Sequence, residues 1–469
     1  MDYAFLGKTI ASIVLISFGT LYLGRTKRKY SFDDLLIVAC LVVFSLIIGN
    51  KVSYRLMALY QKENNSTETY IQEILSYVFS AILVIVLVVM VNQIRRGKYT
   101  LWWNNNRPAP ITYGRDDALA LKGIAILIML FHHLFLKGRF DGYSIAFAPF
   151  SEKQITDIAN YCKVCVSLYA FVSGYGLYLS YSGNRLSDKK WIACRYIKTF
   201  SGFWIVVVLS WIVCQIIDGR TALIYIEKNR GGSGVVNMFL DFLGLACLCG
   251  TKSICGTWWY MSAAFLFILM TPLVARRGNS ISLACIAVFV FIRVIAGGKM
   301  SEYYNTYLGG STPFSYLMPF LIGALFAKKN LINRLINAPH RWLRFLIELI
   351  LLMGTYILYL KISTSYFFDI KWGLLPLPLI LFCVEYVIPR RSLRPILVFL
   401  GKHSMNIFLT HTFIRGTYLQ DTIYSFHHFL ISFLVLLFIS LALSLLIEWI
   451  KKTLRYHGFI DTLCKRIAR

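Results

Sequence analysis

Long apolar stretches separated by short polar loops run along almost the whole chain. A helix needs about 20 mostly apolar residues to cross the roughly 30 Å of hydrocarbon in a bilayer. The spacing therefore predicts an all-α fold, a polytopic membrane helix bundle with about 13 transmembrane helices. The predicted spans are residues 5–23, 33–50, 73–94, 118–136, 162–181, 198–217, 258–275, 279–297, 314–329, 344–361, 373–389, 401–415 and 429–450.

The charges of the loops predict how this bundle is oriented. Lysine and arginine gather in one set of loops, including RTKRK at 25–29 and RRGK at 95–98, and are sparser in the opposite set. Because cytoplasmic loops carry such an excess, we expect an outward N-terminus and a cytoplasmic C-terminus, as an odd number of spans requires. Residues 236–250 are apolar but short and contain Asp241, which indicates a re-entrant or interfacial segment.

A Pro/Asn-rich stretch at 102–110, WWNNNRPAP, indicates a boundary between two parts of the chain. We expect an N-terminal three-span accessory region and basic loop at 1–112, and a ten-span core at 113–450. A basic cytoplasmic tail is expected at 451–469. Residues 1–23 lack a basic segment before the apolar stretch, so the first span is expected to remain in the mature protein.

Composition excludes a soluble protein. Hydrophobic residues make up 57% of the chain and charged residues 15%, against about 25% charged in soluble domains, and the mean hydropathy is +0.62. We attribute the formal charge of +27 to loops beside the anionic lipid of a bilayer, and expect no nucleic-acid partner. The 11 cysteines are scattered without a zinc-ligand spacing, so we expect packing roles and no bound metal.

Ionisable side chains inside predicted spans are candidates for function, because placing them in lipid is costly. Lys122 lies near the cytoplasmic end of its span, and His133 follows eleven residues later on the same helix face, about 16 Å further in. This placement is typical of a pore with a cation at its mouth and a titratable imidazole inside. The alternative is a lysine that reaches back to the interface, and interfacial histidines that hydrogen-bond to their neighbours.

A second histidine is expected at the depth of His133. His411 lies two-thirds of the way through an outward-running span, so its imidazole should be in the outer half of the bundle. His132 is the alternative to His133 if the helix has a different register. A purely structural hydrogen bond remains an alternative for His411.

Four further residues are weaker candidates when each is taken alone. Arg195 begins a span at its cytoplasmic end, where a cation can bind the phosphates of a cytosolic ligand. Trp258 and Trp259 open a span from the outside, and an aromatic belt at the membrane interface is the other interpretation of them. Ser173 belongs to a small-residue stretch that permits close helix packing.

Five short segments occur in the order of a known family pattern. They are LKGIA at 121–125 followed by His133, AFVSGY at 170–175, RYIK at 195–198, FLIG at 320–323 and LGKHSMNIFLTH at 400–411. With the ten-span count, these segments resemble acyltransferase family 3, the integral-membrane acyltransferases that modify cell-surface glycans. The resemblance covers roughly residues 113–450. Two positions depart from the pattern, because Lys122 replaces an Arg and Ala264 replaces a Glu.

The resemblance implies transfer of an acyl group, acetyl by expectation, from cytosolic acyl-CoA to a hydroxyl of a cell-surface polysaccharide or glycolipid at the outer face. It implies a multi-pass protein of the plasma membrane, in a bacterial cell envelope, with acetyl-CoA as donor and no permanently bound cofactor. In the implied site His133 is the general base or a transient acyl carrier, and His132 is the substitute base. His411 orients the acceptor or stabilises the oxyanion. Lys122 and Arg195 bind the CoA phosphates, and the substrate is bound by Ser173, Trp258 and Trp259.

The alternative function is a polytopic transporter or polymerase of lipid-linked oligosaccharide. Such a protein would share the size, the number of spans and the basic loops. It would be expected to show repeated halves or a large, charged outer loop, whereas the halves here are dissimilar and the outer loops modest.

Overall fold

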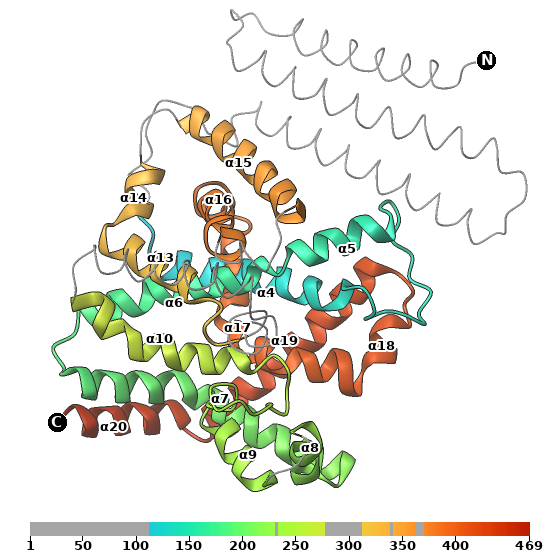
Figure 1. The fold of residues 1–469 in the computed structure, drawn as a ribbon, viewed down its shortest axis with the longest axis vertical. Helices are drawn as coiled ribbons and strands as arrows, with labels where there is room; N and C mark the ends of the chain where they lie inside the picture. The colour runs from blue at the N-terminus through green and yellow to red at the C-terminus, as the bar shows by residue number, and fades with distance from the viewer. Residues whose placement is uncertain (1–111, 230–232, 277–311, 338–340, 362–369) are drawn as a thin grey trace, which may run out of the picture. The chain divides into compact units, whose positions relative to one another are not determined.

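The computed structural model describes residues 112–229, 233–276, 312–337, 341–361 and 370–469. These residues form α-helices joined by loops and by π-helical turns at Ile370–Leu374, Cys383–Val387 and Ile414–Tyr418 (Figure 1). The α-helices are α4 (Arg115–Phe135), α5 (Glu152–Tyr161), α6 (Val164–Ser182), α7 (Asp188–Asp218), α8 (Thr221–Lys228), α9 (Gly234–Phe242), α10 (Trp259–Arg276), α13 (Leu317–Lys328), α14 (Leu331–Ile336), α15 (Arg341–Lys361), α16 (Pro376–Phe382), α17 (Arg394–Phe413), α18 (Gln420–Tyr424), α19 (Phe429–Thr453) and α20 (Tyr456–Ala468).

The helical membrane fold is confirmed for the described part of the chain. Five stretches are long and apolar enough to cross a membrane: α4, the α5–α6 stretch Glu152–Ser182, α7, α10 and α19. The total of 13 spans stays a prediction. The predicted spans 5–23, 33–50, 73–94 and 279–297, and the boundary at 102–110, lie outside the described residues.

Three predicted spans differ from the helices observed. The span expected at 314–329 is the helix α13, which has 12 residues. The span expected at 401–415 is part of α17, which begins earlier, at Arg394, and whose 20 residues give a length of about 30 Å. The span expected at 373–389 is the short helix α16 between two π-helical turns. Pro376 and Pro378 lie at the start of this helix and lack the N–H groups that a continuous α-helix would need.

Two other predicted segments take more structure than the sequence suggested. The segment 236–250 contains α9 and a chain of turns, consistent with a piece that does not span. The expected basic tail includes the helix α20, which packs along α7 (Figure 1). The hydroxyl of Tyr456 donates to the Ser201 carbonyl at 3.1 Å, and the Lys190 ammonium donates to the Ala468 carbonyl at 3.1 Å.

Glycines bring α4 and α17 into backbone contact. A Cβ added to Gly123 would lie 2.1 Å from the carbonyl oxygen of Leu397, and one added to Gly401 would lie 1.9 Å from that of Leu119. Each glycine therefore faces the carbonyl four residues before the other glycine. Association of helices in lipid depends on such small residues, because the surrounding lipid is as apolar as the side chains.

Glycines also bring α6 and α13 into backbone contact. A Cβ on Gly174 would lie 2.0 Å from the Phe320 carbonyl oxygen, and one on Gly323 would lie 2.1 Å from that of Phe171. Together with contacts between α4 and α6, the two glycine crossings join α4, α17, α6 and α13 into one packed unit. The glycine-containing segments LKGIA, AFVSGY, FLIG and LGKHSMNIFLTH thus act first as packing elements.

Polar contacts fix the ends of this unit. Asp117 accepts a hydrogen bond from the Gly114 N–H at 2.8 Å and forms an ion pair with Arg394, which ties the start of α4 to the start of α17. Between α17 and α19, Asn406 donates to Glu448 at 2.9 Å, and the buried Lys451 donates to the same carboxylate at 2.7 Å. These contacts hold α17 in register with both of its neighbours.

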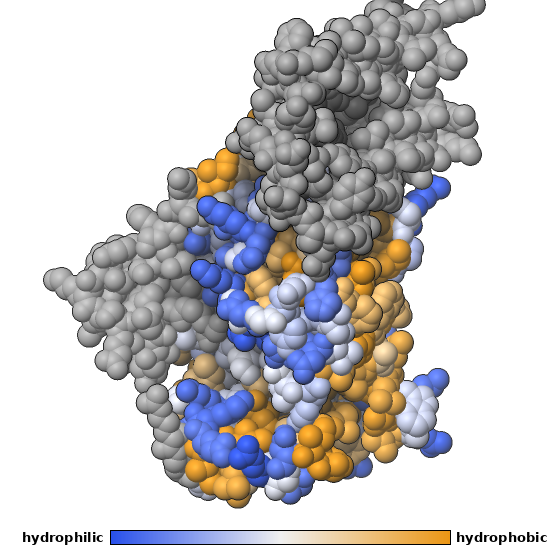
Figure 2. All heavy atoms as spheres, turned by 90° about the vertical axis from the view of Figure 1, so that its right-hand side faces the viewer, coloured by the Kyte–Doolittle hydropathy of each residue, from blue (hydrophilic) through white to orange (hydrophobic). Residues whose placement is uncertain are grey.

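The outer surface of the described helices is strongly apolar. Ile216 on α7 is 77% exposed, Ile350 on α15 68% and Phe438 on α19 64%. Figure 2 shows hydrophobic side chains along one edge of the described surface, beside an area of hydrophilic side chains. Large apolar residues exposed on successive helices fit contact with lipid and not with water.

We predict that Gly123→Ala destabilises the protein. The new Cβ would overlap the Leu397 carbonyl, so α4 and α17 must separate, at a cost of about 1–3 kcal/mol in unfolding free energy. Thermal unfolding of the detergent-purified protein measures the effect. Gly176→Ala is the matched control, because a Cβ at this mid-helix glycine meets no heavy atom within 4 Å; equal melting temperatures for the two variants would contradict the prediction.

Candidate active site

Three imidazole rings meet near the ends of α4 and α17. The ring centroids of His132 and His133 are 4.9 Å apart, and those of His133 and His411 are also 4.9 Å apart. His133 and His411, which were predicted to lie at one depth, are therefore neighbours. His133 occupies the middle of the cluster, with a ring from its own helix on one side and the α17 ring on the other.

Backbone carbonyls determine the tautomers of the two outer rings. The Nδ1 atom of His132 lies 2.7 Å from the Ala159 carbonyl oxygen, and Nδ1 of His411 lies 2.9 Å from that of Phe408. A carbonyl oxygen only accepts, so in both neutral rings Nδ1 carries the proton and Nε2 carries the lone pair. The Thr412 hydroxyl, 3.2 Å from Nε2 of His411, is then the donor of that hydrogen bond.

His133 is the accessible ring of the cluster. His132 is 7% exposed and His411 is fully buried, whereas His133 is half-buried. His132 donates to the Ala159 carbonyl, so it could take part in proton transfer through Nδ1 only by breaking this structural hydrogen bond. A ligand entering this region therefore reaches His133 first.

A buried arginine makes the surroundings of the imidazoles electropositive. Arg415 is 4% exposed, and its charge acts on His132, His133 and His411. No carboxylate pairs with Arg415 among the residues that the structure describes. Preorganised positive charge of this kind stabilises negative charge that develops during a reaction.

Arg415 is a site residue that the sequence analysis missed. It lies one helical turn after His411, at the end of the predicted span 401–415, and its guanidinium is within reach of the Tyr424 hydroxyl. An ionisable residue inside a predicted span was the available signal. Thr412 was missed too, because a threonine next to a histidine carries no signal of its own.

The two cations expected to bind phosphate also come together. Lys122 on α4 and Arg195 on α7 lie close enough for their charges to repel each other. Neither forms an ion pair with any carboxylate in the described ranges, and Nε of Arg195 is buried without a hydrogen-bond partner. Two adjacent cations that lack a counter-ion are a favourable site for a phosphate group.

Hydroxyl groups lie between the cation pair and the imidazole cluster. The Tyr169 hydroxyl donates to the Lys122 carbonyl at 3.3 Å and interacts with the Ser404 hydroxyl. The Tyr260 ring lies 6.3 Å from the Tyr169 ring, and the Tyr260 hydroxyl interacts with that of Ser173. The hydroxyl groups of Tyr169, Ser404, Tyr260 and Ser173 are called the polar track below, and Ser173 belongs to it through its contact with Tyr260.

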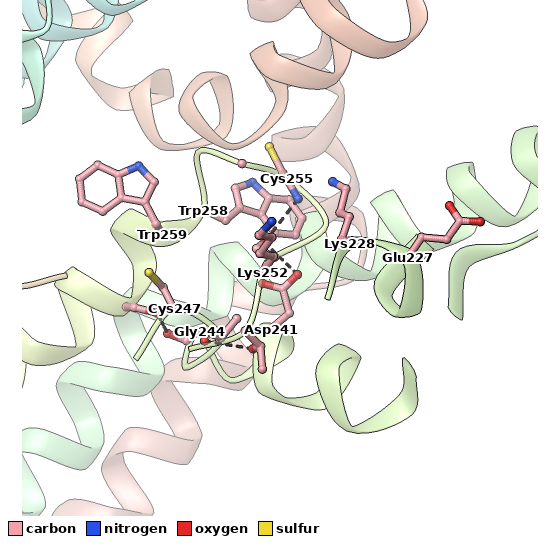
Figure 3. A pocket seen from close by; sticks show the side chains of 14 residues that line it. Glu227, Lys228, Asp241, Gly244, Cys247, Lys252, Cys255, Trp258 and Trp259 are labelled. Carbon is pink, nitrogen blue, oxygen red and sulfur yellow. Dashed lines mark hydrogen bonds between the residues drawn. The ribbon is translucent and has the colours of Figure 1, made fainter. Parts of the chain in front are cut away.

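The two tryptophans have different environments. Trp258 is 2% exposed and its indole N–H donates to the Leu409 carbonyl at 2.9 Å, so it is a structural contact to α17 and not part of an aromatic belt. Trp259 is half-buried and stacks on Tyr316 with ring centroids 5.6 Å apart. Both line a cavity of about 530 Å³ beside α9 and the start of α10 (Figure 3).

No group of three His, Cys, Asp or Glu residues in the described ranges has the arrangement of a metal site. The described site offers lone pairs on imidazoles, cations without counter-ions and hydroxyl groups. The charged group whose field acts on all three imidazoles, Arg415, is positive.

Comparison with known proteins gives one match. A family model described as an acyltransferase domain matches residues 119–449. This range runs from the second turn of α4 through most of α19, and it contains the three imidazoles, the cation pair and the cavity. No curated protein and no solved structure matches the chain.

We predict that His411 exists as the Nδ1–H tautomer, which is opposite to the usual preference of a free imidazole. The reason is that its Nδ1 faces two carbonyl oxygens, those of Phe408 and Ile407, at 2.9 and 3.2 Å. Nitrogen-15 NMR of histidine-labelled protein in detergent reports the tautomer, and loss of the signal in His411→Asn assigns it. A protonated Nε2 on a neutral His411 ring would contradict the hydrogen bonding described above.

Proposed function

The chain belongs to acyltransferase family 3, and from this premise we propose that it transfers an acyl group, acetyl in the first instance, from cytosolic acyl-CoA to a hydroxyl of a cell-surface polysaccharide or glycolipid. One observation carries the proposal. Lys122 of the cation pair and His133 of the imidazole cluster lie eleven residues apart on α4, and the Tyr169 hydroxyl bonds to α4 between them. A thioester donor with a phosphate-bearing head and a reactive far end fits this layout.

The donor enters from the Lys122 end, which the loop charges assign to the cytoplasm. Lys122 and Arg195 bind its phosphates, and this offsets the repulsion between their charges. Eleven residues separate Lys122 from His133, a rise of about 16 Å along α4. The long pantetheine arm covers this rise and presents the thioester carbonyl to the imidazoles.

At the other end, His133 acts as general base. It takes the proton of the acceptor hydroxyl while the hydroxyl oxygen bonds to the thioester carbonyl carbon. The C–S bond then breaks, and the thiolate leaves as CoA and takes the proton back from the imidazolium. The products are an acyl ester and CoA thiol, and the enzyme returns to its starting state.

The neighbours of His133 support this step. The positive charge of Arg415 stabilises the oxyanion of the tetrahedral intermediate. His411, held by Phe408 and Thr412, orients the acceptor and limits the motion of the His133 ring. In this reaction only the acyl group crosses the bilayer, in a multi-pass plasma-membrane protein with its C-terminus in the cytoplasm.

The first test replaces the base. His133→Ala is expected to lower transfer of label from [14C]acetyl-CoA to surface glycan by about 10²–10⁴-fold, the usual contribution of a general base. Membrane insertion should be unchanged, because His133 is half-buried and, among the described residues, its aromatic ring contacts are to His132 and His411. His457→Ala is the control, since this histidine is 70% exposed on α20. Wild-type activity in His133→Ala would contradict its role, and activity in neither protein would favour the transporter alternative.

The second test concerns the donor phosphates. Arg195→Gln is expected to raise the KM for acetyl-CoA about 10–100-fold, because a charge-assisted contact contributes roughly 1.5–3 kcal/mol. The kcat should change little, since Arg195 is at the opposite end of the polar track from the imidazoles. Arg185→Gln, an exposed arginine of the loop before α7, is the matched control. An unchanged KM in Arg195→Gln would remove this residue from donor binding.

A further inference from the structure

The lining of the cavity in Figure 3 does not include Lys122 or Arg195, and the bonds described below connect its wall to α17 beside His411. Its volume of about 530 Å³ is within the range of small-molecule sites, roughly 300–1,000 Å³. Its lining combines an indole face with polar groups of both charges. The residues that matter below are Asp241, Lys252, Cys255, Gly256, Trp259 and Ser262.

A pair of threonines connects this cavity to His411. The Thr257 hydroxyl lies 3.4 Å from that of Thr412, which lies 3.2 Å from Nε2 of His411. Because Nε2 only accepts, Thr412 donates to it and accepts from Thr257 in turn. The thiol of Cys255, which lines the cavity, lies 3.2 Å from the Thr257 hydroxyl and completes the connection.

A second contact holds the same wall of the cavity in place. Trp258 donates its indole N–H to the carbonyl of Leu409, two residues before His411 on α17. The loop from Cys255 to Trp258 is therefore bonded to α17 on both sides of His411 in the sequence, at Leu409 and at Thr412. The distance between the cavity and the imidazoles is set by these bonds and not by a mobile loop.

The opposite wall is also rigid and polar. Oδ2 of the buried Asp241 accepts from the Tyr225 hydroxyl at 2.6 Å, the Ser253 hydroxyl at 2.9 Å and the Ile254 N–H at 3.0 Å. Burial raises the pKa of the Asp241 carboxyl, and these hydrogen bonds oppose that shift. Ser262 donates to the Gly244 carbonyl at 2.7 Å, and this hydrogen bond joins two residues that line the cavity.

We propose that this cavity is the acceptor site and holds one sugar residue of the acceptor glycan. The inference rests on the proposed acyl transfer. An aromatic surface at Trp259, with carboxylate, ammonium and hydroxyl groups around it, suits a ring that is apolar on its faces and carries hydroxyls at its rim. The threonine pair keeps the bound sugar next to the imidazole cluster, so donor and acceptor reach His133 from two different sides.

The test fills the cavity without touching the histidines. Gly256 lines the cavity, and a Cβ there meets no heavy atom within 4 Å, so Gly256→Leu places a side chain in the open space. Purified protein in detergent receives [14C]acetyl-CoA and a partial hydrolysate of the envelope polysaccharide. Labelled saccharide and labelled acetate, the product of transfer to water, are measured separately.

Gly256→Leu is expected to raise the KM for saccharide at least tenfold. The KM for acetyl-CoA and the rate of acetate release should stay within about twofold of wild type. Gly176→Leu is the control for the substitution itself, because that glycine is exposed on α6 and has open space around it. An unchanged KM for saccharide in Gly256→Leu overturns the proposal.

Two further outcomes are separated by the same measurements. If Gly256→Leu does not fold, Lys252→Ala decides, since Lys252 is exposed at the cavity and its removal should also raise the KM for saccharide. An unchanged KM in that variant overturns the proposal. If the wild type yields neither labelled saccharide nor labelled acetate, the acyltransferase function itself fails, which differs from failure of the acceptor site alone.

Discussion

The backbone contact between α4 and α17 is the constraint on which the site depends. Gly123 and Gly401 each admit a carbonyl of the other helix where any side chain would collide. His133 follows Gly123 by ten residues, and His411 follows Gly401 by ten. Because the two helices are matched at the glycines and at the Asp117–Arg394 ion pair, equal spacing along each helix brings both imidazoles to one level. The 4.9 Å ring separation is thus a consequence of packing several turns away.

The unpaired charged side chains at the two ends of the polar track are all cations. Lys122, Arg195 and Arg415 form no ion pair with a described carboxylate, although other charges of the bundle are paired, Asp117 with Arg394 and Glu448 with Lys451. Holding partly or fully buried cations without counter-ions is costly. The two ion pairs show that charged side chains which join helices in this fold are neutralised by a partner. Unneutralised cations at the two ends of the polar track are therefore best explained by a ligand that is itself anionic or becomes so.

Periodicity and span direction were sufficient to place His133, His411, Lys122 and Arg195, because each argument used distances along a single helix. What the sequence did not reveal depends on contacts between distant segments. Thr257 and Thr412 meet across 155 positions of the chain, and neither has a neighbour pattern that points to the other. The role of Trp258 was obscured for the same reason, since its indole N–H bonds to a carbonyl of α17. Hydropathy also overestimated the continuity of 373–389, where proline chemistry outweighs apolar content.

The departures from the family pattern have a consistent electrostatic meaning. The position of the family's glutamate is occupied by Ala264, and the described site around the imidazoles offers guanidinium groups, hydroxyls and ring nitrogens. In the proposed reaction no carboxylate shares the proton with His133, so the imidazole must both accept it from the hydroxyl and return it to the thiolate. A ring placed between two others of fixed tautomer suits this task. His132 and His411 have committed their Nδ1 protons to carbonyls, and Nε2 of His411 already accepts from Thr412, so in the proposed reaction the proton moves on the His133 ring between them.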